Sequence, residues 1–376
     1  MRILVLHDPY KPIVNGSVGG EDNLVQLEIE QLSKLGNEVI DARTFDSGGV
    51  RKFNQLRAQS YGSHREVLTT IQKTYPDVIH THNLSQRSGY KWMEQTDVPI
   101  VSSIHNYRLF CASSIAWRNG NNCFECRDKS GLSAFRHQCD GVRGAINASR
   151  LLFFQPTQPQ IQSPKLFLTG SEMMNTALSP IIPAKKMRIL RNPGLANRLR
   201  QNPSRSRKGW LFAGRFVEEK GIIDLIQNWP PSEQLDLAGS GPLSEKIFKL
   251  IESRPHIRMI GTFPPGTLDI YYGYEGLIFP STWLEGSPLV IADALSTGTP
   301  VIALDVSAAR EQVELSRAGV VIAGELNVPK LESAFKNIRL KSVDYSSNAL
   351  IAADTHFSIQ TWTTLLNQYL SEATSL

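Results

Sequence analysis

The sequence predicts an α/β protein made of two doubly wound halves of similar size. At 376 residues the chain is too long for one ordinary core. In both halves, short apolar runs alternate with segments of helical periodicity, which is the pattern of βαβ units and a parallel sheet. The turn-forming run Arg191-Asn-Pro-Gly194 separates the halves. We therefore expect two domains, residues 1–190 and 191–355, with a ligand cleft between them at the carboxyl ends of their strands.

The first half opens with an apolar run that predicts a buried strand over residues 2–8. A Gly-containing loop follows over residues 15–20, and a helix then ends at Gly36. The apolar positions that recur at helical spacing are Leu24, Leu27, Leu32 and Leu35. Further strands are expected at residues 39–43, 77–81, 100–105 and 166–171.

The second half repeats this scheme, beginning with a strand over residues 210–213. Further strands are expected at residues 235–238, 258–260, 276–279 and 301–304. Residues 356–376 form an amphipathic closing helix with Ile359, Trp362, Leu365 or Leu366, and Leu370 along one face. We expect this helix to pack back toward the N-terminal domain and to contact both domains.

The composition, with 41% hydrophobic and 20% charged residues, is that of a folded globular protein and excludes a disordered chain. No apolar run approaches the roughly 20 residues that span a bilayer. The short apolar start fits a first strand better than a signal peptide, so we expect a cytoplasmic protein. Between Lys185 and Lys208 lie nine Lys or Arg and no acid. This run is either a solvated linker or an electropositive zone for phosphates or for the inner face of an anionic membrane.

Three motifs, in order along the chain, carry a resemblance to a known family. Gly19-Gly20-Glu21 follows the first strand, Phe212-Ala-Gly-Arg-Phe-Val-Glu-Glu-Lys-Gly221 opens the second half, and Pro280-Ser-Thr-Trp-Leu-Glu-Gly-Ser-Pro-Leu-Val-Ile-Ala-Asp-Ala-Leu-Ser-Thr-Gly-Thr-Pro-Val-Ile302 follows later. The last segment closely resembles the E-x7-E donor signature of glycosyltransferase family 4. Smaller matches are His105, Ser171-Glu172 and Asn192. The resemblance implies a GT-B fold of two Rossmann-like domains and a retaining transfer from a nucleotide sugar.

The motif residues suit this chemistry, because a nucleotide-sugar donor loses a diphosphate on which negative charge grows. Arg215 and Lys220, with Gly214, lie on a strand-to-helix turn where fixed positive groups can stabilise that charge. Further donor-binding groups are expected at Gly19, Gly20, Gly286, Ser287, Leu289 and Val290. The first two would allow the opposite domain to approach the diphosphate closely; alone, they would indicate only a turn.

Two acids complete the expected donor site. By resemblance, Glu285 contacts hydroxyls of the transferred sugar, and the acid eight positions later holds the ribose. That second acid is Asp293 rather than the usual Glu. It keeps a carboxylate but is shorter by one methylene, so the ribose must lie closer or bind through water. The alternative is an Asp on an exposed helix surface.

Histidines cluster at the ends of two predicted strands. His105 is expected beside the reacting sugar by resemblance, with a core histidine at a strand end as the alternative. His80 and His82 alternate on one strand face. A metal pair is conceivable there, but the sequence indicates no third ligand, so we interpret them as structural or acceptor-lining.

All four cysteines lie in an insertion over about residues 108–145, and their spacing is C-x11-C-x2-C-x12-C. These residues are Cys111, Cys123, Cys126 and Cys139. The spacing can close a tetrahedral structural zinc site, and in a reducing cytosol metal binding is favoured over two disulfides. Unligated buried thiols are the alternative. A redox role is disfavoured because Cys-x2-Cys does not open a helix after a strand.

We therefore expect a retaining hexosyltransferase with a UDP- or GDP-sugar donor and a saccharide or lipid-linked saccharide acceptor, without a catalytic cofactor. Peripheral contact with an anionic membrane is an additional expectation, and nucleic acid is not an expected partner. Alternatives are a nucleotide-sugar epimerase or a phosphorylase of the same fold, and a non-catalytic nucleotide-sugar or zinc-dependent binding protein. The phosphorylase lacks a candidate cofactor lysine motif, and the Glu-Gly-x-Pro-Leu run at Glu285 disfavours the epimerase.

Overall fold

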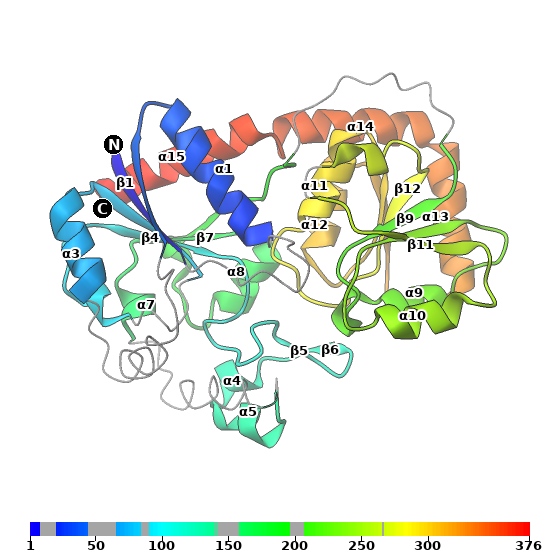
Figure 1. Cartoon of the computed structure of the whole chain (residues 1–376), viewed down its shortest axis with the longest axis horizontal. Coiled ribbons are helices and arrows are strands. Elements are labelled where there is room, and N and C mark those ends of the chain that lie inside the picture. Colours follow the sequence, from blue (N-terminus) through cyan, green and yellow to red (C-terminus); the bar gives the residue numbers. More distant parts are fainter. Residues whose placement is uncertain are drawn as a thin grey trace.

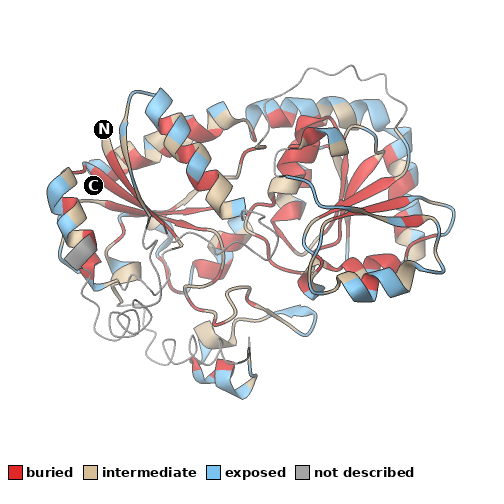
Figure 2. Ribbon diagram, viewed as in Figure 1, coloured by how far each residue is buried: buried red, intermediate tan, exposed pale blue. Residues whose placement is uncertain are grey.

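The computed structural model describes residues 1–7, 20–43, 65–83, 90–139, 141, 158–195, 207–264 and 267–376. It contains two six-stranded sheets whose strands all pair in parallel, with helices on both faces, and this confirms the predicted α/β class. Figure 1 shows the two sheets side by side, and Figure 2 shows that both consist mainly of buried residues. Parallel sheets are covered on both faces, which explains the continuous apolar runs of their strands.

The first sheet has the order β2-β1-β3-β4-β7-β8. Its strands are β1 (Arg2–His7), β2 (Glu38–Arg43), β3 (Val78–His82), β4 (Ile100–Ile104), β7 (Leu166–Thr169) and β8 (Met187–Ile189). The second sheet has the order β11-β10-β9-β12-β13-β14. Its strands are β9 (Trp210–Ala213), β10 (Leu235–Ala238), β11 (Ile257–Gly261), β12 (Gly276–Phe279), β13 (Val301–Leu304) and β14 (Gly319–Ile322).

The helices of the first domain are α1 (Gly20–Lys34), α3 (Arg65–Thr74), α7 (Pro159–Gln162) and α8 (Glu172–Leu178), with 3-10 turns at Lys91–Glu94 and Ala184–Lys186. Those of the second domain are α9 (Ile222–Gln227), α10 (Ser244–Ile251), α11 (Leu289–Ser296), α12 (Ala308–Ser316), α13 (Val328–Leu340) and α14 (Ser342–Thr355), with 3-10 turns at Glu218–Lys220 and Leu268–Ile270. The final helix is α15 (Ile359–Thr374). In the described part of the chain, no helix combines the length and apolarity needed to cross a membrane.

The ten predicted strands are present within one or two residues of their expected bounds, but the edge strands β8 and β14 were not predicted. The central strands are buried along most of their length, so their sequences are continuously apolar. In contrast, most residues of β8 and β14 are only half-buried. An edge strand with few buried positions has no clear apolar signature.

Helix α1 differs from its predicted pattern at two positions. It ends at Lys34, Leu35 is 54% exposed, and Gly36 adopts a left-handed φ of 83° that stops the helix as predicted. The buried face instead includes Glu28, which is 0% exposed. Leu35 thus lies outside the buried face although it fits the helical spacing, and the sequence analysis missed a charged residue on that face.

The chain crosses between the domains at Phe357, just before α15. The Phe357 side chain belongs to the core of the second sheet, and its carbonyl accepts a hydrogen bond from the N–H of Gly194 at 2.9 Å. From there α15 runs along the first domain and buries Trp362, Leu366 and Leu370 against the first sheet. This hydrogen bond ties the segment before α15 to the 190–195 connection.

The basic run from Lys185 to Lys208 is largely engaged within the protein where it is described. Lys186 donates to two backbone carbonyls, Arg188 pairs with Glu372, and Arg207 donates to carbonyls at the end of α11. Arg191 lies 3.6 Å from Glu311. Residues 196–206 lie outside the described residues. These partners show that much of the run is structural.

Candidate active site

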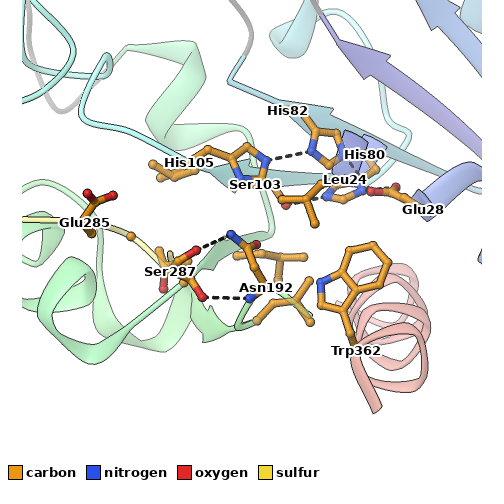
Figure 3. Close-up of a pocket in the computed structure, with 16 residues that line it drawn as sticks. Leu24, Glu28, His80, His82, Ser103, His105, Asn192, Glu285, Ser287 and Trp362 are labelled. Carbon is orange, nitrogen blue, oxygen red and sulfur yellow. Dashed lines mark hydrogen bonds and ion pairs between the residues drawn. The ribbon is translucent and has the colours of Figure 1, made fainter. Parts of the chain in front are cut away.

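A cavity of about 90 Å³ lies between the two domains. The first domain lines it with the ends of β3, β4 and β7, the second with the loop 285–287, and Trp362 closes one side (Figure 3). Because this is where the strands of parallel sheets end, it is the expected place for a ligand. The predicted residues His105, Glu285, Gly286 and Ser287 all line this cavity.

Two glycines allow the domains to approach each other here. A Cβ atom on Gly170, just after β7, would lie 2.5 Å from the carbonyl oxygen of Gly286. Similarly, a Cβ on Gly20, at the start of α1, would lie 3.0 Å from the side chain of Leu289, at the start of α11. Both side chains would crowd the interface. Gly20 was predicted and Gly170 was not; Gly19 lies outside the described residues.

Asn192 holds the junction against the donor-signature loop. Its side-chain amide donates to the carbonyl oxygen of Ser287 at 2.7 Å, and its backbone N–H donates to Oγ of Ser287 at 3.0 Å (Figure 3). Ser287 is therefore partly occupied in joining the domains. The next residues, Leu289 and Val290, begin α11, where first-turn amides have no partner within the helix and can receive an anion.

Lys220 and Glu285 form a direct ion pair. Glu285 is 6% exposed and also accepts a hydrogen bond from Oγ of Ser281 at 3.1 Å. The Lys220 ammonium lies 5.4 Å from the ring centre of Phe279 and 5.3 Å from that of Trp283. The sequence places these two groups 65 residues apart, and the fold brings the predicted phosphate-binding cation directly onto the predicted sugar-binding acid.

Arg215 lies outside this pair. Its guanidinium is half-exposed and lies 3.6 Å from the carboxylate of Glu219. The backbone carbonyl of Gly214 closely faces Gly239, where a Cβ would lie 1.9 Å away. Because its guanidinium is half-exposed, Arg215 keeps one side open to solvent, where it can contact a ligand.

Asp293 is buried on α11, so the alternative of an Asp on an exposed helix surface was wrong, but it is not among the residues that line the cavity. Its Oδ1 accepts a hydrogen bond from the N–H of Leu195 at 2.8 Å. Burial raises the pKa of Asp293 to about 6, although the Leu195 N–H lowers it. The Asp293 carboxylate thus anchors the segment 190–195 between the domains. Its Oδ2 takes no part in the bond to Leu195.

His105, itself half-buried, is linked to a chain of buried polar groups that the sequence did not reveal. Its Nε2 lies 3.0 Å from Nδ1 of His82, and the two rings are stacked at 5.3 Å. On the other side, Nε2 of His82 lies 2.8 Å from Oε2 of Glu28. Oε1 of Glu28 lies 2.5 Å from Nδ1 of His80, whose Nε2 lies 2.8 Å from Oγ of Ser103. Figure 3 shows these groups along one side of the cavity, which all of them line.

The charges of this cluster follow from its burial. Burial alone would raise the pKa of Glu28, but His80 and His82 hold it well below its usual range. Burial lowers the pKa of His80 despite Glu28, and it lowers that of His105 to about 4. Glu28 is therefore a carboxylate at neutral pH, and His105 is a neutral ring.

We infer the tautomers from these neighbours, since a carboxylate can only accept. In the tautomer of His82 that carries its proton on Nε2, toward Glu28, Nδ1 of His82 accepts from Nε2–H of His105. The Nδ1 atom of His105 is then the ring nitrogen left as an acceptor. His105 is thus oriented by a buried acid, rather than being only a core histidine.

Among the described residues, one group of three side chains could hold a metal ion. Its members are Glu28, His80 and His82, and their potential ligand atoms lie within 4.8 Å of one another. The expectation that no third ligand accompanies the two histidines was therefore wrong. The third ligand was missed because Glu28 lies on a helix, 52 residues before His80. Most of the ring nitrogens and carboxylate oxygens of these three residues already contact a neighbouring side chain.

Glu311 was also missed by sequence reasoning. Its carboxylate, on α12, accepts from the N–H of Glu172 at 2.9 Å and from that of Met173 at 2.6 Å. These amides open α8, whose cap is Ser171. An acid from the second domain therefore occupies a helix start of the first, an electrostatically favourable contact that no local pattern could indicate.

Two parallel six-stranded sheets, with a cavity between their strand ends, form the GT-B fold that solved glycosyltransferase structures share. The chain is similar to sucrose-phosphate synthase from Thermosynechococcus elongatus, with a TM-score of 0.70, 16% identity and 100% of each chain covered. It is also similar to Anabaena Alr3699/HepE, solved in complex with UDP-glucose, with a TM-score of 0.66, 16% identity, and 99% and 100% of the two chains covered. At these identities the likeness concerns the fold alone.

Sequence comparison finds a family match in the second domain. Residues 197–342 match the family model described as "Glycosyl transferases group 1". The chain is 23% identical over 257 residues to TuaC of Bacillus subtilis (strain 168), a protein provisionally named as a teichuronic acid biosynthesis glycosyltransferase. That match covers 65% of this chain and 58% of the relative.

Proposed function

We propose that this protein is a retaining glycosyltransferase that moves a hexose from a UDP- or GDP-sugar to a saccharide or lipid-linked saccharide acceptor. The observation that carries the proposal is the Lys220–Glu285 pair beside a cavity whose opposite wall holds His105. The UDP-glucose complex of Alr3699/HepE supports a UDP-hexose donor. The name of TuaC supports an acceptor in polysaccharide or glycoconjugate biosynthesis.

In this proposal the bond between the anomeric carbon and the diphosphate oxygen breaks, and the diphosphate leaves with growing negative charge. Lys220 and Arg215 stabilise that charge, together with the starts of α1 and α11, which meet at Gly20 and Leu289. When the donor binds, its diphosphate becomes a partner of Lys220 and replaces part of the bond between Lys220 and Glu285. Glu285 then becomes an acceptor for sugar hydroxyls.

The acceptor hydroxyl attacks the anomeric carbon on the same face from which the diphosphate departs, so the anomeric configuration is retained. Its hydroxyl proton passes to the departing phosphate oxygen, and no second catalytic carboxylate is needed. The free Nδ1 of His105 accepts a hydrogen bond from a hydroxyl of the transferred sugar, and Asp293 accepts from the ribose. A lipid-linked acceptor would bring the protein to the inner face of the membrane.

The test is a thermal-shift and calorimetric screen against UDP, GDP, ADP and their common hexose conjugates. We expect one nucleotide and its sugar conjugate to stabilise the wild type but not Arg215→Ala or Lys220→Ala. NMR of the product should then show transfer to an added glycan with the donor's anomeric configuration. Absence of binding across the panel would overturn the proposal. Conversion of the nucleotide sugar without nucleotide release would favour an epimerase instead.

A further inference from the structure

The cysteine-bearing segment forms a small unit that stands apart from both sheets (Figure 1). It contains a short hairpin of β5 (Trp117–Arg118) and β6 (Asn121–Asn122), then α4 (Glu125–Asp128) and α5 (Leu132–Arg136). Where α4 and α5 meet, the described buried core consists of Ala112 and Ala134, with Cys126 and Cys139 packed on them. Phe110 and Ala116 pack into a larger cluster of the first domain, but the end of the segment that carries α4 and α5 has only this small core. Small units of this kind usually need a cross-link or a metal.

The four thiols converge on this unit without forming disulfides. Sγ of Cys111 accepts a hydrogen bond from the N–H of Ala116 at 3.3 Å, and the carbonyl of Ala116 accepts from the N–H of Cys123 at 2.7 Å. Cys111 and Cys123 are thus joined through one residue. The N–H of Ala112 approaches Sγ of Cys126, and Cys126 shares its alanine contacts with Cys139. Backbone N–H groups aimed at sulfur are well suited to thiolates, whose charge they stabilise.

We propose that Cys111, Cys123, Cys126 and Cys139 together bind one zinc ion in a tetrahedral site. Four sulfur ligands select a thiophilic cation over magnesium or calcium. Binding releases the four thiol protons, and the metal charge replaces them. Ala112 follows Cys111 in the chain and packs with Cys126 and Cys139, so the segment brings these thiols to one small core. Among the described residues, no three of these sulfurs lie within 4.8 Å of one another. Zinc binding must therefore draw the four sulfurs closer together.

The cysteine-bearing segment also contacts the loop that carries Glu285. Nε1–H of Trp117 donates to Oγ1 of Thr282 at 3.1 Å, three residues before Glu285. Phe110, Phe124 and Trp117 pack in one cluster with Trp283 and Leu284, on the same loop. Zinc therefore holds the unit against the loop that carries Glu285. This last step rests on the proposed function, whereas the zinc site itself does not.

The first experiment measures metal in the full chain purified without added zinc or chelator. We expect about one zinc per chain, lost in Cys126→Ser and retained in His80→Ala, which disrupts the other candidate ligand group. In protein loaded with cobalt(II), we expect the absorption bands of tetrahedral thiolate coordination. Both readouts are independent of catalysis. They also use the wild type, so a Cys126→Ser variant that fails to fold does not decide the result.

Several outcomes would overturn the zinc site. These are four titratable thiols in the native protein with no bound metal, two disulfides in protein denatured without reductant, or zinc that is lost with His80→Ala but kept in Cys126→Ser. The link to the donor loop is tested separately by Trp117→Phe. This variant should retain zinc and bind the identified nucleotide sugar several-fold more weakly; unchanged donor binding would remove the link but leave the zinc site standing.

Discussion

Nδ1 of His82 lies 3.0 Å from Nε2 of His105, so a histidine on the cavity wall is held by a second histidine that Glu28 in turn orients. His82 can influence a sugar in the cavity through His105, because the buried acid sets which nitrogen of each ring carries the proton. The pair therefore acts as one unit.

This coupling predicts non-additive kinetics. His105→Ala should lower kcat on the order of a hundredfold, within the range for a positioned polar catalytic group, and His82→Ala somewhat less. The double variant should be no slower than His105→Ala alone, because His82 acts through His105. Steady-state rates of the four proteins test this. Multiplying losses would mean that the two histidines act independently.

The pair of Lys220 and Glu285 predicts a large loss of transition-state stabilisation. Lys220→Ala or Arg215→Ala should each cost about 2–4 kcal/mol in kcat/KM, the usual effect of removing one preorganised donor. Lys249→Ala is the matched control, since Lys249 also pairs with a glutamate but is exposed on α10. Turnover within a few-fold of wild type in both active-site variants would refute their assigned roles.

Asp293 predicts a pH-dependent difference in stability. Because its pKa is raised from 3.8 to about 6 in the folded state, folding favours the protonated form. Its stabilising contribution is fully present below about pH 4 and is lost as pH rises through about 6, by about 3 kcal/mol at 1.36 kcal/mol per pH unit. Relative to wild type, Asp293→Asn should therefore gain stability across this window in urea unfolding. The exposed Asp269→Asn should show no such gain, and a flat difference for Asp293→Asn would contradict the buried carboxylate.

Gly170 predicts a defect in domain approach without loss of folding. In Gly170→Ala the new methyl group would meet the carbonyl oxygen of Gly286 at 2.5 Å, so the domains must separate slightly. We expect the donor KM to rise at least about tenfold, because a small misplacement weakens every contact across the cleft. Gly273→Ala is the control, since a Cβ there meets no atom within 4 Å. Equal donor KM values for the two variants would show that the contact at Gly170 does not set the closure.

The sequence by itself determined the α/β class, ten of the twelve strands of the two large sheets, and the motif segments at His105, Arg215 to Lys220 and Glu285. These are local properties, since a buried parallel strand needs a continuous apolar run and a strand-to-helix loop needs its glycines. Only the tertiary structure decided that Glu28 lies beside His80 and His82, that Lys220 pairs with Glu285, and that Gly170 faces Gly286. Each of these contacts joins residues at least 52 positions apart. Periodicity reports which face of an element is buried; which side chains meet there depends on how the two sheets and their helices pack.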